Sequence, residues 1–364
     1  MAVKFHWAGD ALHNTDTPDL RLARLEEILR ACGSVCIGYS GGVDSVFLAK
    51  VALDVLGPEN VLAVTGRSEA YPEVQRDMAL ECSREHGIPH LEIHTDELQD
   101  PNYAANPTNR CYFCKSELWT RLRGVADAHD LAYVLDGSNA DDARDYRPGM
   151  QAAREREVRS PLLEAGLTKE DIRMFSQRLN LPTWDQPSSP CLSSRLPYGL
   201  AVTPQRLREV EAAEVAVRAL GFRDFRVRHH GDAARIELPA AELPAAAAGA
   251  AALATAVRGA GFTRVLLDVE GYRRGALNEV LVSIGGVRDA KNDARDAKDD
   301  ARGARDAWSD AVEAIGHAND IAVLMPDTDF AQLRERAAVV RERGYRYATI
   351  DLDALAGATC AFDP

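Results

Sequence analysis

The sequence predicts an α/β protein that consists of a doubly wound parallel sheet and a second, smaller α+β domain. Three observations predict this fold. Short apolar runs alternate with helical segments from residue 21 to residue 282, a glycine-rich turn separates the first strand from the helix after it, and a proline-rich stretch interrupts the alternation between residues 182 and 204. Parallel strands need long crossover connections, so strands separated by whole helices favour a parallel sheet.

The first domain, residues 1–185, contains four short apolar segments that we expect to be strands. The helix after the first strand covers residues 43–56, another begins near Pro72, and a third covers residues 110–128. Proline is favoured in the first turn of a helix, which supports the second of these starts. Ligands of doubly wound sheets bind at the carboxyl ends of the strands. The expected strands are residues 35–39, 61–65, 90–94 and 133–136.

The second domain, residues 186–283, begins in the proline-rich stretch and continues as an α+β unit. Residues 284–316 are rich in Asp, Arg, Lys and Ala, and opposite charges recur at helical spacing, so we expect a charged helical linker. Residues 317–364 are expected to form a small C-terminal appendage, to which the sequence assigns no role. The expected elements are helices at 203–220, 241–258 and 330–343 and strands at 225–229, 234–238, 264–269, 321–325 and 347–352.

Composition limits the classes of function. The formal net charge is −13, which disfavours sequence-independent nucleic-acid binding because that binding depends on Lys and Arg. The sequence shows no long apolar segment and no secretion signal, so we expect a cytoplasmic protein with no membrane partner. Seven cysteines, an odd number, argue against a disulfide framework. Cys32, Cys36 and Cys82 lie in apolar surroundings and are expected to be buried thiols, whereas Cys360 receives no role.

The glycine-rich turn runs from Ser40 to Ser45, and its chemistry predicts a phosphate site. Two glycines let the backbone approach a ligand closely, and the amides at the start of the following helix attract an anion. Asp44 beside phosphates is suited to bind Mg²⁺ or to orient the nucleotide. The turn lacks the lysine of the P-loop of kinases and GTPases. The predicted ATP-binding residues here are Ser40, Gly41, Gly42, Asp44 and Ser45.

A second polar segment, Asp136 to Asp142, follows the fourth strand at the same edge of the sheet. Two interpretations stay open. Its side chains hold magnesium or orient the nucleotide, or they form an Asn/Asp turn with a helix N-cap. We include Asn139 and Asp142 among the predicted ATP-binding residues.

Three further cysteines carry chemistry. Cys111 and Cys114 open a helix, where the N-terminus favours a thiolate, and Cys191 lies in the proline-rich stretch. Three thiolates are one ligand short of a closed four-ligand site, so they suit an iron–sulfur cluster with one open iron. A redox Cys-x-x-Cys pair and a zinc site with a histidine as fourth ligand are the alternatives.

These motifs resemble those of the PP-loop ATP pyrophosphatases and, more specifically, those of the LarE family of ATP-dependent sulfur transferases. The resemblance covers roughly residues 18–283 and leaves the residues after about 285 without a counterpart. The resembling segments are residues 39–45, 109–115, 136–142, 159–162, 190–199, 226–230 and 268–273.

The resemblance implies a Rossmann-like fold and a reaction in which ATP, with Mg²⁺, is cleaved between its α- and β-phosphates. The implied substrate is pyridinium-3,5-biscarboxylic acid mononucleotide, whose carboxylates are adenylated and converted to thiocarboxylates in nickel-pincer cofactor biosynthesis, with release of pyrophosphate and AMP. Cys191 matches the catalytic, sulfur-delivering cysteine. Cys111, Cys114 and Cys191 match a version with a [4Fe-4S] cluster that takes sulfide or another sulfur donor; in the alternative version Cys191 gives up its own sulfur. A homo-oligomer, specifically a hexamer, is also implied.

The anionic groups of this substrate require cations. Arg226 and Arg228 alternate along one strand, so their side chains share a face, and guanidinium forks suit phosphate and carboxylate oxygens. Glu214 is either a metal-binding acid of the family or a solvated helix residue, and we favour the second. His229 and His230 are expected to belong to the packing or the surface. The predicted substrate-binding residues are Ser194, Arg195, Arg226, Arg228 and Arg273.

Three other functions share parts of this pattern. A tRNA-thiolating enzyme of the same superfamily would use the same loop and cysteines, but the acidic charge and the missing basic RNA-binding module argue against stable nucleic-acid binding. An ammonia-using synthetase would not need Cys111, Cys114 and Cys191. A non-catalytic nucleotide sensor is disfavoured by the intact Asp44 and by the cysteine set.

Overall fold

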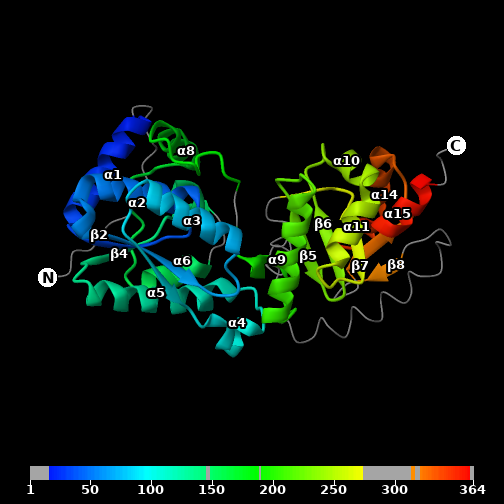
Figure 1. Cartoon of the computed structure of the whole chain (residues 1–364), viewed down its shortest axis with the longest axis horizontal. Coiled ribbons are helices and arrows are strands. Elements are labelled where there is room, and N and C mark those ends of the chain that lie inside the picture. Colours follow the sequence, from blue (N-terminus) through cyan, green and yellow to red (C-terminus); the bar gives the residue numbers. More distant parts are fainter. Residues whose placement is uncertain (1–15, 145–147, 188–189, 274–312, 316–319, 361–364) are drawn as a thin grey trace. The chain divides into compact units, whose positions relative to one another are not determined.

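The computed structural model describes residues 16–144, 148–187, 190–273, 313–315 and 320–360 (Figure 1). The chain divides into two compact units. The first unit comprises Met1–Ser68, Glu73–Asp96 and Cys111–Ser189, and the second comprises Glu69–Pro72, Glu97–Arg110 and Pro190–Pro364. Two short segments, 69–72 and 97–110, therefore belong to the second unit, although the residues on either side of each segment belong to the first.

The sheet of the first unit is entirely parallel, with the strand order β3-β2-β1-β4 among the described residues. Val35 of β1 lies opposite Val61 of β2 on one side and Tyr133 of β4 on the other. The chain runs outward from β1 to β3 and then crosses back to β4, so the strand order reverses between β1 and β4. Ligands of doubly wound sheets bind at this switch point. The strands are β1 (Val35–Gly38), β2 (Val61–Arg67), β3 (His90–His94) and β4 (Tyr133–Leu135).

Helices cover both faces of this sheet (Figure 1). One face packs against α1, α2, α3 and α8 through a core that includes Leu25, Phe47 and Phe175. The other face packs against α5 and α6 through a core that includes Trp119 and Leu122. The helices are α1 (Pro18–Cys32), α2 (Val43–Leu56), α3 (Glu73–Glu85), α5 (Arg110–Ala128), α6 (Pro148–Glu155), α7 (Pro161–Glu164) and α8 (Lys169–Arg178), with 3₁₀ turns η1 (Pro58–Asn60) and η3 (Ala140–Arg144).

The sheet of the second unit is mixed, with the order β5-β6-β7-β10-β9-β8 among the described residues. β6 and β7 are parallel, as are β9 and β10, and the other neighbours are antiparallel. The strands are β5 (Arg226–His230), β6 (Ala233–Glu237), β7 (Arg264–Asp268), β8 (Glu313–Ile315), β9 (Ile321–Leu324) and β10 (Tyr347–Asp351).

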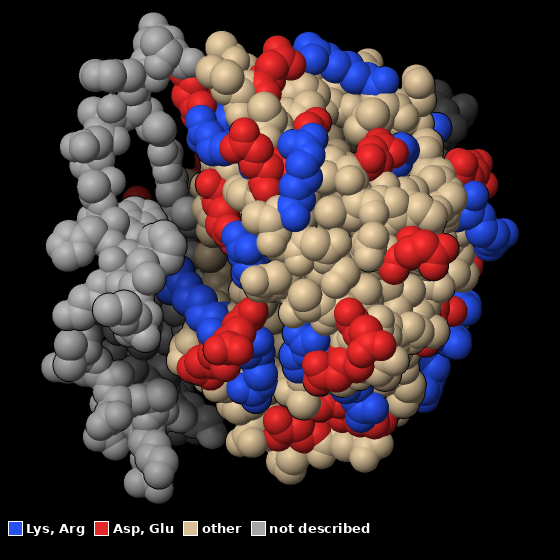
Figure 2. Space-filling model, turned by 90° about the vertical axis from the view of Figure 1, so that its left-hand side faces the viewer, with Lys and Arg blue, Asp and Glu red and all other residues tan. Residues whose placement is uncertain are grey.

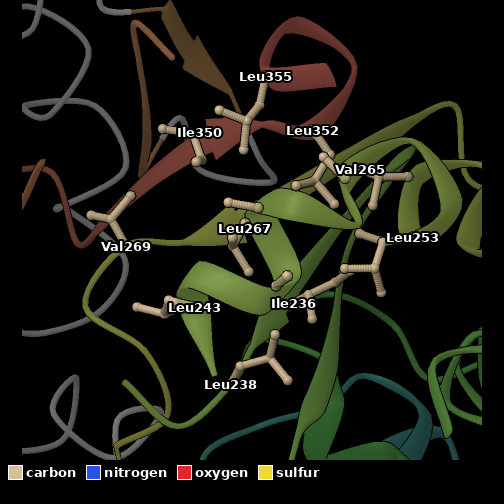
Figure 3. Packing of buried hydrophobic residues seen from close by; sticks show 14 of the residues in the cluster. Ile236, Leu238, Leu243, Leu253, Val265, Leu267, Val269, Ile350, Leu352 and Leu355 are labelled. Atoms are coloured by element: carbon tan, nitrogen blue, oxygen red, sulfur yellow. The ribbon is translucent and has the colours of Figure 1, made fainter. Parts of the chain in front are cut away.

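The core of the second unit joins this sheet to its helices. Figure 3 shows Ile236, Leu267 and Ile350 from three different strands packed with Leu253 and Leu355 from two helices. None of the described helices is long and apolar enough to cross a membrane. The helices are α4 (Pro101–Ala104), α9 (Pro204–Ala219), α10 (Leu243–Ala248), α11 (Ala250–Arg258), α14 (Phe330–Glu342) and α15 (Leu352–Cys360), with 3₁₀ turns η2 (Glu97–Gln99) and η4 (Leu192–Arg195).

The predicted fold class, a doubly wound parallel sheet with a second domain of mixed secondary structure, is confirmed. The alanine-rich segment forms two helices, α10 and α11, because the chain breaks at Gly249. The C-terminal residues expected to form an appendage instead extend the second sheet, since β10 pairs with β7 and places Ile350 opposite Leu267. The expected charged helical linker falls on residues 284–316; of these, 284–312 and 316 lie outside the described residues, and 313–315 form β8.

Candidate active site

The glycine-rich turn lies between β1 and α2, at the switch point of the first sheet. Gly41 adopts a φ of +67°, and a side chain there would come within 2.6 Å of the Ala79 Cβ, so the position requires glycine. The Ser45 hydroxyl accepts a hydrogen bond from the Ser40 amide (3.2 Å) and donates one to the Gly42 carbonyl (3.0 Å). Ser45 is buried and shapes the turn from within, whereas Ser40 is exposed beside it.

The polar segment after β4 contacts this turn. The Asn139 amide donates to the Asp44 carboxylate over 3.2 Å. A side chain at Gly137 would lie 3.2 Å from the Ser45 amide nitrogen, so the two loops approach closely. The Asp142 carboxylate accepts from the Asn139 backbone amide over 3.1 Å. Asn139 thus contacts Asp44, and Asp142 stabilises the turn; the role of the segment in holding magnesium or the nucleotide stays a prediction.

Lys169 is a residue of this site that sequence reasoning missed. Its ammonium lies 2.5 Å from the Asp44 carboxylate, and its backbone amide donates to Asp141 over 2.8 Å. Thr168 and Asp171 form a capping box that starts α8 at Lys169 and so fixes the origin of the lysine side chain. The capping-box pattern was visible in the sequence, but it marks only a helix start.

Two buried polar residues hold the backbone that leads into the turn. The Gln75 amide donates to the Ser40 carbonyl over 3.0 Å, and the Thr65 hydroxyl donates to the Tyr39 carbonyl over 2.7 Å. His90 lies 2.8 Å from the same Thr65 hydroxyl, and burial lowers the pKa of its imidazole. The turn is thus held from β2, β3 and α3, which pre-orders its amides for a ligand.

In the second unit, Cys191 precedes the 3₁₀ turn η4 and is half-buried. Arg195 closes this loop, because one of its nitrogens donates to the carbonyls of Pro190 (2.5 Å) and Cys191 (3.2 Å). Its other two nitrogens form a fork with the Glu214 carboxylate at 2.9 and 3.0 Å. The expectation that Glu214 is a solvated helix residue is wrong: its side chain is only 12% exposed, and it also accepts from the Val227 amide.

Arg226 and Arg228 lie on β5 and are both buried. Arg228 donates two hydrogen bonds to Glu237, at 2.9 and 2.7 Å, and one to the Ser194 carbonyl at 2.8 Å. Burial, followed by repulsion from Arg195, lowers the pKa of the Arg226 guanidinium. Arg195 and Arg228 therefore hold the Cys191 loop through its carbonyls, while Glu214 and Glu237 balance their charges.

The remaining predicted residues occupy simpler environments. Arg273 lies 3.8 Å from Glu270. His229 and His230 are buried; His229 contacts Glu209 at 2.8 Å, and burial lowers the pKa of both imidazoles. Both histidines therefore belong to the packing, as one of the two expectations had it.

The cysteines fall into two groups. Cys32, Cys36 and Cys82 are buried, as expected, and burial raises the pKa of each thiol, to about 12 for Cys36. Cys111 is exposed and Cys114 half-buried near the start of α5, where residues three apart share a helix face. Among the described residues, no group of three or more His, Cys, Asp or Glu side chains is arranged to hold a metal ion. Cys111 and Cys114 belong to the first unit and Cys191 to the second.

A doubly wound sheet with this serine- and glycine-rich turn at its switch point defines a nucleotide-using enzyme of the PP-loop class. The NAD synthase family model matches residues 23–131. An uncharacterized protein of Synechocystis is 46% identical over 72% of this chain and 98% of its own length. The pyridinium-3,5-bisthiocarboxylic acid mononucleotide synthase of Lactiplantibacillus plantarum is 38% identical over 71% of this chain and 94% of its own length. The chain therefore belongs to the LarE family and is an ATP-dependent enzyme.

A solved structure is also similar. The NMN synthetase from Francisella tularensis is 19% identical, with a TM-score of 0.38 over 48% of this chain and 76% of that chain, a likeness that carries no further conclusion. The Synechocystis relative is matched almost end to end over 263 residues, so more than a quarter of this chain has no counterpart in it.

Proposed function

We propose that this chain adenylates the carboxylates of pyridinium-3,5-biscarboxylic acid mononucleotide with ATP and converts them to thiocarboxylates. The observation that carries the proposal is the Cys191 loop, where a half-buried thiol lies in a loop held by Arg195 and Arg228. Guanidinium groups beside a sulfur nucleophile suit an acceptor that carries a phosphate and carboxylates. The product named for the Lactiplantibacillus relative supports the same chemistry.

The first step belongs to the turn between β1 and α2. A carboxylate oxygen of the substrate attacks the α-phosphorus of ATP, the bond to the bridging oxygen breaks, and pyrophosphate leaves with that electron pair. The amides at the start of α2 and the Lys169 ammonium stabilise the negative charge of the phosphates. Asp44 would hold Mg²⁺, which when bound neutralises charge on the leaving pyrophosphate. Asn139 orients the Asp44 carboxylate through its 3.2 Å hydrogen bond.

The second step replaces the adenylate oxygen with sulfur. A sulfur nucleophile attacks the acyl carbon, the acyl–oxygen bond breaks, and AMP leaves with the electron pair. Arg195 and Arg228 hold the Cys191 loop through its carbonyls, and the loop presents the thiol to the acceptor.

Two sources of sulfur fit the donor set. In the first, Cys111, Cys114 and Cys191 would hold a [4Fe-4S] cluster, which when bound would supply sulfide. Cys111 is exposed and the other two thiols are half-buried, so all three are accessible as ligands. We favour this source because Cys111 and Cys114 otherwise have no assigned chemistry.

In the second, the Cys191 sulfur itself attacks the acyl carbon and forms a thioester as AMP leaves. Loss of the Cys191 α-proton and cleavage of its Cβ–S bond then release the thiocarboxylate and leave dehydroalanine. The chain becomes lighter by about 34 Da, the mass of hydrogen sulfide, and each chain acts once.

A tRNA acceptor is less consistent with the surface. Figure 2 shows basic and acidic side chains interspersed on one face of the molecule, and the formal net charge is −13. Nucleic-acid binding depends on basic stripes that follow the phosphate backbone. The predicted homo-hexamer rests on the family resemblance, and size-exclusion chromatography with light scattering tests it.

The test is anaerobic incubation with ATP, sulfide and the biscarboxylic mononucleotide, with nicotinamide mononucleotide, which lacks a free carboxylate, as the control. We expect pyrophosphate, AMP and a product heavier by about 16 Da per oxygen replaced by sulfur. A cluster predicts about four irons per chain, repeated turnover, and loss of both in Cys111→Ala but not in the buried control Cys82→Ala. Full single-turnover activity of Cys111→Ala with mass loss at Cys191 contradicts the cluster and leaves the thiolation standing. Pyrophosphate release that is independent of the mononucleotide contradicts the whole proposal.

A further inference from the structure

The Cys191 loop is bound by two segments that come from far away in the sequence. The Leu192 amide donates to the Ala70 carbonyl over 2.9 Å, and the Val202 amide donates to the Ala104 carbonyl over 2.8 Å. Ala70 lies three residues after the end of β2, and Ala104 lies in α4, which follows β3 along the chain. Residues 69–72 and 97–110 therefore serve the second unit as supports for the loop that carries the sulfur nucleophile.

Asn106 is the centre of this support. It is fully buried and adopts a φ of +54°, a conformation that few residues other than glycine and asparagine tolerate. Its side-chain amide donates to the Pro197 carbonyl (2.7 Å) and the Leu200 carbonyl (2.8 Å), and its backbone carbonyl accepts from the Gly199 amide (2.9 Å). One side chain thus fixes two points on the C-terminal side of the Cys191 loop.

Arg110 and Tyr103 hold the loop at Ser193, closer to Cys191. One nitrogen of Arg110 donates to the Ser193 carbonyl (2.8 Å) and to the Asn106 side-chain oxygen (2.6 Å). The Tyr103 hydroxyl lies 2.6 Å from the Ser193 hydroxyl. Arg110 and Tyr103 are 5% and 1% exposed, so these contacts are shielded from water and rigid.

We propose that Tyr103, Asn106 and Arg110 are positioning residues that set the conformation of the Cys191 loop for sulfur transfer. We call these three residues the anchor. The inference rests on the proposed function, because the anchor holds the loop of the proposed sulfur-delivering cysteine. Arg110 holds the carbonyl of Ser193, which lies two residues after Cys191.

The anchor differs from ordinary core packing in what it bonds. Within the Cys191 loop it bonds the main-chain carbonyls of Ser193, Pro197 and Leu200 and the Ser193 hydroxyl. Weakening the anchor should therefore loosen Cys191 without changing the phosphate site. Losing one buried hydrogen bond of this kind corresponds to roughly a five- to tenfold change in the exposure of the loop.

The experiment compares Tyr103→Phe with Tyr133→Phe. Both variants remove one phenolic hydroxyl, but Tyr133 lies on β4 of the first unit and is 38% exposed. Arg110→Met and Arg110→Lys form a second pair, in which lysine keeps the charge and should restore part of the effect. The readouts are the alkylation rate of Cys191 measured by peptide mass spectrometry, the iron content after anaerobic purification, the ATP affinity and the melting temperature.

We expect Tyr103→Phe and Arg110→Met to raise the alkylation rate of Cys191 roughly five- to tenfold and to lower the iron retained per chain, with ATP affinity within about twofold of wild type. Tyr133→Phe should change neither the alkylation rate nor the iron content. Unchanged alkylation and iron content in a folded Tyr103→Phe overturn the anchor. Wild-type protein that contains no iron contradicts the proposed cluster but not the anchor, because the alkylation rates of Cys191 still test the anchor.

Discussion

The buried pair between Arg228 and Glu237 allows the sharpest test of the second unit. Glu237 is 1% exposed, and one of its oxygens accepts both hydrogen bonds from Arg228. Its other oxygen lies 2.8 Å from Arg235. Burial alone would raise the pKa of Glu237, but attraction to Arg235 and then Arg228 outweighs it and lowers the pKa. Glu237 therefore stays ionised and depends on both cations.

Arg228→Met removes one of these two cations and leaves the carboxylate buried. Breaking a buried pair costs about 3–5 kcal/mol, and the remaining Arg235 places our expectation at the lower end, about 3 kcal/mol. That free energy corresponds to roughly a hundredfold increase in the opening of β5 and β6. The exposed Arg223 is the control, because surface substitutions usually change the unfolding free energy by less than about 0.5 kcal/mol.

Hydrogen exchange followed by mass spectrometry measures this opening within the peptides that cover β5 and β6, so the first unit does not confuse the result. The double variant Arg228→Met with Glu237→Gln should cost less than the sum of the single variants, because glutamine leaves no buried charge to be compensated. Additivity within about 0.5 kcal/mol would refute the coupling. Because Arg228 also donates to the Ser194 carbonyl, the same variant should weaken mononucleotide binding more than ATP binding.

Three further predictions follow from other parts of the molecule. Asp44→Asn should abolish pyrophosphate release, and Lys169→Met should raise the KM for ATP about tenfold. Both variants should keep the melting temperature of the wild type, since both side chains are partly exposed. Pyrophosphate release at a near wild-type rate would contradict the assignment of the phosphate site to this turn. Burial lowers the pKa of His90, His229 and His230, so the native state binds fewer protons than the unfolded state. The contribution of these histidines to the unfolding free energy should be fully present above about pH 6.5 and should decrease at lower pH, by up to about 1.4 kcal/mol per pH unit for each histidine. An unfolding free energy that does not change between about pH 7.5 and 5.5 would contradict this. A chain that ends before Glu313 should lose the cooperative unfolding of the second unit, because Leu333, Ile350 and Leu355 leave its core and β7 loses a partner; an unchanged melting curve would argue otherwise.

The sequence by itself determined the local elements and the class of enzyme. The strand before Ser40, the helix that begins at Val43 and the helix from Arg110 to Ala128 agree with the structure, because apolar periodicity and helix starts are properties of neighbouring residues. The glycine pair also marked the tight turn between β1 and α2, since close backbone approach demands glycine at Gly41.

Only the tertiary structure decided which distant side chains meet. Lys169 reaches Asp44 across 125 residues, and Arg110 reaches Ser193 across 83. Glu214 lies on a helix with few sequence signs of burial, yet it pairs with Arg195. β10, which begins at Tyr347, joins β7, which ends at Asp268, although 78 residues lie between them. Pairing and burial depend on where the chain returns, and hydrophobic periodicity within one segment carries no information about that return.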